Sequence, residues 1–129
     1  MTGRSFYAWT LLAFGAGVGL GSAPARSEST PRMWSQQLLR LTTNQIPRPV
    51  ALWVSDDHWE PGAETRRHRH PGPTVIYVLE GELVEVTSEG TTALKAGQAV
   101  WRAAQHEHDV RNVSGRPARA LAIHLDPAP

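Results

Sequence analysis

Frequent glycine and proline residues are the feature that most limits the fold of this chain, because they leave room only for short elements. The 129 residues include 11 glycines and 10 prolines. From residue 50 onward, short β-branched and aromatic stretches alternate with turn residues roughly every eight to twelve positions, a spacing typical of all-β sandwiches and barrels. No strand–helix alternation is visible, which argues against a doubly wound sheet. We expect strands over residues 50–55, 65–70, 75–79, 83–87, 91–94, 99–102, 108–113 and 118–125.

The first 25 residues are set apart from this pattern and read as a secretion signal. Arg4 gives a positive start, residues 6–21 carry no charge, and Ala23 and Ala25 are small residues at the positions that a signal peptidase recognises. An uncleaved membrane anchor is the alternative, but the apolar stretch is shorter than the roughly 20 residues of a spanning helix and contains four glycines. We therefore predict cleavage after Ala25, by a general secretion route, and a secreted or periplasmic protein.

The remaining chain divides into an N-terminal arm over residues 26–45 and one domain over residues 46–129. Apolar residues within 34–41 have a helix-like spacing, but the segment is short enough to form a strand or an arm instead. Without Arg4, 12 basic residues balance 12 acidic ones, so neither nucleic acid nor a membrane surface is expected as a partner. The absence of cysteine excludes disulfides and thiolate metal sites.

Histidines provide the chemistry that the sequence offers. His68 and His70 are two residues apart, so in a strand both side chains point to one face and two imidazoles can reach one metal ion. That spacing alone is also compatible with two hydrogen-bonded surface histidines. Arg67 and Arg69 then face the other way, which fits a solvated outer face.

Two motifs around these histidines resemble those of the cupin family. Gly62, His68, His70 and Gly81 have the spacing of the first cupin motif, in which a glutamate follows the second histidine after three residues. The segments 96–98 and 108–112 resemble the second motif, which ends in a histidine and an asparagine with three residues between them. The resemblance covers about residues 50–125 and implies a small antiparallel cupin barrel.

In that family one divalent metal is held by the histidines of both motifs, which implies His68, His70 and His108 as ligands here. The position of the motif glutamate is occupied by Thr74, whose neutral hydroxyl is a poor ligand. The Pro-x-Gly turn of the second motif is also missing, since residues 103–105 are Ala-Ala-Gln. Three neutral histidines leave the full charge on the ion, so anionic ligands should be favoured. Such a site suits Fe, Ni, Cu, Zn or Mn better than Mg or Ca, and a barrel without metal is the alternative.

Other residues near the motifs receive narrower predictions. His106 is either a fourth ligand or a residue outside the ligand shell, because it also forms a His-x-His pair but lies in a turn of the family. Glu80, Glu82 and Glu85 surround a tight turn and read as an exposed edge. The residues expected to line or brace the cavity are Trp53, Ile76, Val110, Asn112 and His124.

The resemblance implies two classes of function. The first is a metal-dependent enzyme, such as a dioxygenase, that acts on a small anionic or phenolic molecule. The second is a non-catalytic barrel that binds or senses a small molecule. No nucleophile constellation or phosphate loop is visible that would decide between them. Cupins of this size commonly pair through their sheets, so a homodimer is expected.

Overall fold

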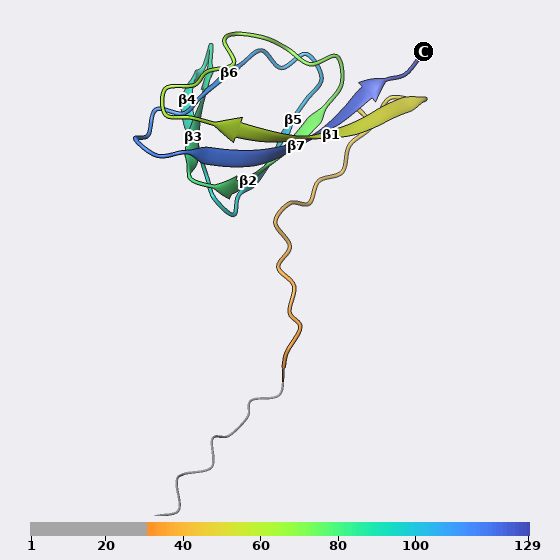
Figure 1. The fold of residues 1–129 in the computed structure, drawn as a ribbon. Helices are drawn as coiled ribbons and strands as arrows, with labels where there is room; N and C mark the ends of the chain where they lie inside the picture. Colours follow the sequence, from red (N-terminus) through yellow and green to blue (C-terminus); the bar gives the residue numbers. More distant parts are fainter. Residues whose placement is uncertain (1–30) are drawn as a thin grey trace, which may run out of the picture. The chain divides into compact units, whose positions relative to one another are not determined.

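The computed structural model describes residues 31–129, and these fold into two antiparallel sheets that face each other (Figure 1). The larger sheet has the order β1-β7-β2-β5, and the smaller has the order β4-β3-β6. In the larger sheet no two neighbouring strands are consecutive in sequence, whereas β3 and β4 of the smaller sheet form a hairpin. The strands are β1 (Val50–Trp59), β2 (Thr74–Glu80), β3 (Glu82–Thr87), β4 (Gly90–Lys95), β5 (Ala99–Arg102), β6 (Asp109–Arg111) and β7 (Ala118–Pro127).

Strand β7 is central to the larger sheet because it pairs with both β1 and β2. Its register places His124 opposite Trp53 on one side and opposite Thr74 on the other. Successive strand residues alternate between the two faces of a sheet. The sheet therefore brings one row of β1 side chains and one row of β7 side chains to the interior.

The buried apolar core lies between the sheets. Leu83, Leu94 and Val78 are almost completely buried, and they come from three different strands. Strand β7 contributes alanines to the same interior, where larger side chains would fill the space. Large side chains therefore fill the interior beside β3 and β4, whereas the small side chains of β7 leave more space.

A glycine at each end of the first motif is explained by the backbone. Gly62 has a φ of +85° and Gly81 a φ of +75°, values that side chains with a Cβ rarely adopt. A Cβ on Gly81 would also lie 2.7 Å from the carbonyl oxygen of Pro117. Gly81 therefore permits the tight connection between β2 and β3.

The predicted all-β fold is confirmed, and seven of the eight predicted strands form. The strand predicted over residues 65–70 is wrong, because this segment makes a single isolated bridge, between His68 and His108. Residues 31–49 contain neither the helix nor the strand considered for the arm. The signal peptide predicted for residues 1–25 lies outside the described residues. Within residues 31–129, no helix is long and apolar enough to cross a membrane.

Candidate metal centre

Two segments that are distant in sequence bring three histidines together. His68 and His70 lie in the connection between β1 and β2, and His108 immediately precedes β6. Backbone hydrogen bonds link His68 and His108 in both directions, with N–O distances of 2.9 and 3.0 Å. The Nε2 atoms of His68 and His70 are 3.1 Å apart, and one nitrogen from each of the three rings lies within 4.8 Å of the others.

Hydrogen bonds at the far side of two rings fix which nitrogen is free. Nδ1 of His68 lies 2.8 Å from the carbonyl oxygen of Arg66, and Nδ1 of His108 lies 2.7 Å from Oε1 of Glu85. Both partners only accept hydrogen bonds when Glu85 is ionised, so each Nδ1 carries the proton. The lone pair of each Nε2 then points away from these partners.

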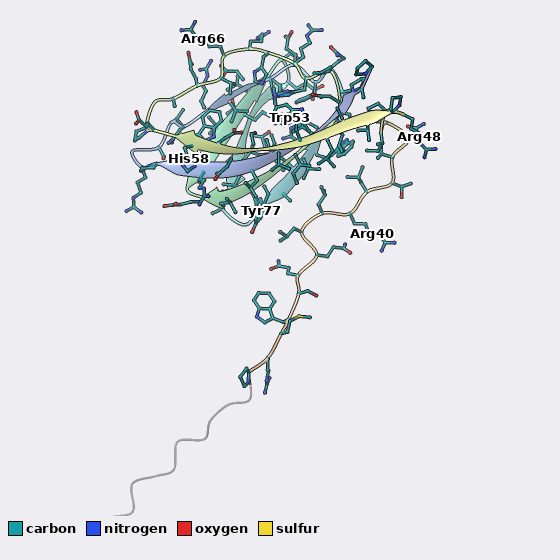
Figure 2. All side chains as sticks on the ribbon, turned by 45° about the vertical axis from the view of Figure 1, so that its right-hand side comes forward. Arg40, Arg48, Trp53, His58, Arg66 and Tyr77 are labelled. Atoms are coloured by element: carbon teal, nitrogen blue, oxygen red, sulfur yellow. The ribbon has the colours of Figure 1, made fainter. Side chains whose placement is uncertain are left out.

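Arg66, whose carbonyl oxygen contacts His68, has an unusual backbone conformation. Its φ is +61°, in the left-handed region that residues with a Cβ seldom occupy. Figure 2 shows Arg66 on the loop at the edge of the barrel. The strained residue presents its carbonyl oxygen to His68, and such strain is often found at functional sites.

The residues fit a divalent metal ion. Nε2 of His108 is buried and has no hydrogen-bond partner, which is costly for a polar atom unless something else binds it. Two metal–nitrogen bonds of about 2.1 Å span up to about 4.2 Å, so His68 and His70 can bind the same ion. The three rings thus provide nitrogen donors within 4.8 Å of one another.

Glu85 is a buried part of this centre, and the prediction that it lies on an exposed edge is wrong. Its exposed fraction is 2%, because β3 pairs with β6 and turns Glu85 inward behind His108. Arg102 donates to both carboxylate oxygens through Nε, at 2.7 and 2.8 Å. Burial raises the pKa of Glu85, but the hydrogen bonds from His108 and Arg102 outweigh burial and lower it to about 2. Glu85 is therefore ionised at neutral pH.

His70 stays neutral over a wide pH range. Burial is the largest cause, and the neighbouring rings of His124, His68 and His108 add to it, so that the pKa of His70 falls from 6.5 to about 4. Protons compete with metal ions for the same nitrogen lone pair. A low pKa keeps this donor available to a metal even in mildly acidic solution.

Comparison with known proteins identifies the family. The description "Cupin domain" matches residues 57–124, just over half of the chain. The chain belongs to the cupin family. This cupin is 45% identical over 64 residues to the β-alanine degradation protein BauB of Pseudomonas aeruginosa, covering 47% of this chain and 67% of that protein.

Solved cupin structures agree with the fold. A cupin domain from Bordetella pertussis Tohama I is 29% identical with a TM-score of 0.53, covering 64% of this chain and 88% of its own. A protein from Thermus thermophilus is also 29% identical with a TM-score of 0.53, covering 70% of this chain and 92% of its own. The barrel predicted from the two motifs is thus confirmed, and cupins often bind a metal.

A cavity of about 260 Å³ opens beside the three histidines of this cupin. Ile76, Val110, His124 and Trp53 are among the residues that line it. Trp53, labelled on β1 in Figure 2, stacks on His124 with ring centroids 3.6 Å apart and an angle of 7° between the planes. Apart from the histidines and a few polar side chains, the walls are apolar.

Asn112 is not among the residues that line the cavity. It is fully buried, and its amide donates to the carbonyl oxygens of Trp59 and Arg116 at 3.1 and 2.7 Å. Asn112 therefore braces the connection between β6 and β7. Strand alternation suggested an inward direction, but β6 ends at Arg111 and the chain turns there.

Thr74 occupies the position where the family has a glutamate ligand. It is buried and lines the cavity, and its hydroxyl lies 3.3 Å from Nδ1 of His124. His124 is thus a hydrogen-bonded interior histidine. The pair puts neutral polar groups where many cupins have a negative charge, so the centre keeps only neutral donors.

His106 lies behind the ligand cluster rather than within it. Its Nε2 is 3.5 Å from Oε1 of Glu85, and it forms a second group of donor atoms with Glu85 and His108. A cation in that second group would lie close to the guanidinium of Arg102, which already pairs with Glu85. Of the two positions considered for His106, the geometry favours the one outside the ligand shell.

Several residues of the site were missed in the sequence. Glu85 and Arg102 contact the centre from behind, and no local pattern distinguishes them from surface charges. Ser55, Asp57 and Thr65 line the cavity. Ser55 and Asp57 share the face of Trp53 on β1, which continues to Trp59, four residues beyond its predicted end. A longer strand prediction would have placed Asp57 on that face, whereas Ser55 already lay within the predicted strand.

Proposed function

We propose that this cupin binds one divalent transition-metal ion through His68, His70 and His108, and that the ion binds a small anionic organic molecule in the adjoining cavity. The unpartnered, buried Nε2 of His108 is the observation that carries the proposal. Burying an imidazole nitrogen without a partner costs free energy, and a metal ion bound to it and to the two neighbouring imidazoles would offset that cost.

The donor set limits the ion. Imidazole nitrogen suits iron, nickel, copper, zinc and manganese, whereas magnesium and calcium prefer oxygen donors. Glu85 supports the proposal because a carboxylate behind a ligating histidine orients the ring and increases its basicity. The negative charge of Glu85 is already compensated by Arg102, so the ion retains most of its positive charge for a further ligand.

The cavity indicates the kind of molecule. Its volume of about 260 Å³ is just below the usual range for drug-sized ligands, so only a small molecule fits. Neutral donors leave a strong attraction for carboxylates or enolates. The Pseudomonas relative is named for β-alanine degradation, and β-alanine is a small carboxylate, which makes it a suitable first probe.

When bound, the metal would supply Lewis-acid polarisation of an oxygen of the bound molecule. The chain itself orients the donors through Glu85 and the Arg66 carbonyl, and it excludes water with the apolar walls of the cavity. Trp53, stacked on His124, offers a flat aromatic surface to the ligand. An oxygenase activity and a purely binding role both use these features, and turnover of a bound compound would distinguish them.

The test is metal content and ligand binding of the full chain, beside the His68→Ala and His108→Ala variants. We expect close to one metal ion per chain in the parent and a loss of at least about tenfold in affinity in either variant. Small carboxylates should raise the melting temperature of the metal-loaded parent and leave both variants unchanged. A parent that binds no metal after reconstitution would show that the barrel has lost the ion.

A further inference from the structure

Asp57 places a carboxylate inside the cavity, away from the histidines. It lies on the inner face of β1 with Trp53, Ser55 and Trp59, and all four line the cavity. In the register of β1 and β7, Trp53 is opposite His124 and Asp57 is opposite Ala120. Asp57 follows Trp53 by four strand residues, which span roughly 13 Å. Asp57 is therefore at most about that far along β1 from the Trp53–His124 pair.

Asp57 has no ionic partner in the part of the chain that the structure describes. Its carboxylate makes no side-chain hydrogen bond or salt bridge there. The adjacent Asp56 differs, because it points to the outer face and pairs with Arg119 through two hydrogen bonds of 2.8 and 2.7 Å. Two neighbouring aspartates on one strand therefore have opposite surroundings.

The surroundings of Asp57 favour a positively charged partner. The side chain is partly buried, and the neighbouring cavity walls include Ile76, Leu83 and Ala120. A carboxylate beside apolar groups loses part of its hydration and gains most from a donor that is itself charged. No group of potential metal ligands among residues 31–129 includes Asp57, so it does not extend the metal centre.

Asp57 also acts on the histidine end of the cavity. Burial lowers the pKa of His124, and the charges of Asp126 and Asp57 partly oppose this effect. His124 in turn lies beside His70, with ring centroids 4.7 Å apart. The cavity thus has a nitrogen-rich end and an acidic side within reach of one small molecule.

We propose that the cavity recognises a zwitterionic molecule, whose carboxylate binds the metal and whose protonated amine is bound by Asp57. This inference rests on the proposed function, since the metal supplies one of the two contacts. It adds the second contact, which selects amino carboxylates over simple carboxylates. The apolar walls between the two ends fit the methylene groups that join them.

Calorimetric titration of the metal-loaded full chain tests the selection. The probes are straight-chain ω-amino carboxylates of three to eight carbons and the matching carboxylates without the amine. We expect the best amino carboxylate to bind about tenfold more tightly than its partner, the effect of one charge-assisted hydrogen bond. Asp57→Asn should abolish that preference, while the simple carboxylate still binds to the metal-loaded variant. Asp56→Asn is the matched control and should keep the preference.

The outcomes separate this inference from the proposed function. If simple and amino carboxylates bind the parent equally, or if Asp57→Asn keeps the preference, Asp57 does not bind the amine and only the metal–carboxylate function stands. If no carboxylate binds the metal-loaded parent, both proposals fail. An unchanged melting temperature of the Asp57→Asn variant confirms that a lost preference is not a loss of folding.

Discussion

At the scale of single residues, the carboxylate of this centre lies behind a histidine instead of at the ligand position of the family. The family's position for a glutamate ligand is Thr74, and the buried carboxylate closest to the histidines is Glu85, which contacts His108 at 2.7 Å from behind. It contacts the ring at Nδ1, and Nε2 has no hydrogen-bond partner. It therefore orients His108 and keeps the proton on Nδ1, which leaves Nε2 free for a metal.

Replacing Glu85 with glutamine is expected to weaken metal binding by about 10- to 100-fold, because the amide neither accepts as strongly from Nδ1 nor carries the charge. Competition with a chromogenic chelator measures this affinity. Glu82→Gln is the control, since Glu82 lies on the same strand but is exposed. Circular dichroism at the assay temperature must show both variants folded, because Glu85 also pairs with Arg102. Equal affinity in the two variants would remove the positioning role.

At the scale of elements, β7 creates the cavity through small side chains. Its inward row is Ala118, Ala120, Ala122 and His124, all of them buried. Three alanines in succession leave the space that larger residues would occupy, and the histidine at the end of the row lies beside the metal centre. The strand thus combines a wall of the cavity with a polar end.

Ala122→Leu tests the contribution of β7. Ala122 lies opposite Ser55 on one side and Ile76 on the other, so a leucine would project into the cavity. We expect carboxylate binding to fall by at least about tenfold while metal content stays unchanged, with a destabilisation of about 1–3 kcal/mol from overpacking. Ligand titration, metal analysis and denaturant unfolding on one preparation measure all three. Undiminished carboxylate binding would mean that the ligand lies elsewhere.

At the scale of the whole molecule, the barrel gathers ionisable groups that respond differently to acid. Burial and the neighbouring rings lower the pKa of His70, whereas hydrogen bonds from His108 and Arg102 stabilise Glu85 as an anion. Without metal, the folded state therefore resists protonation of His70 more than the unfolded chain does. The expected homodimer, which sedimentation can examine, stays a prediction.

We predict that the metal-free protein loses stability as the pH falls from 7 to 5. The pKa of His70 is about 4 in the folded protein and 6.5 in the unfolded chain, so the unfolded state takes up the proton first. The loss therefore starts near pH 6.5 and continues toward pH 4, whereas the contribution of Glu85, whose pKa is 4.5 in the unfolded chain and about 2 in the folded protein, is lost mainly below pH 5. Denaturant unfolding at pH 7, 6 and 5 should show a steeper loss in the parent than in His70→Gln. Parallel curves would contradict the assignment.

Much of this protein follows from the sequence alone. Alternating residues and turn glycines predict seven strands correctly, although not the end of β1, because the two-residue period and the left-handed φ at Gly62 and Gly81 are local properties. The spacing of His68, His70 and His108 within two motifs identifies the family for the same reason. The secretion signal, cleavage after Ala25 and a metal at the three histidines remain predictions from that reading.

Tertiary structure decided the rest, because it depends on contacts between distant segments. The β3–β6 pairing buries Glu85, which lies 23 residues from His108 in sequence, so no local pattern reveals its role. The β1–β7 register directs Asp57 inward and Asp56 outward, and it extends β1 beyond its predicted end. Burial and charge pairing, rather than residue type, separate a functional carboxylate from a surface one, and only the folded chain specifies them.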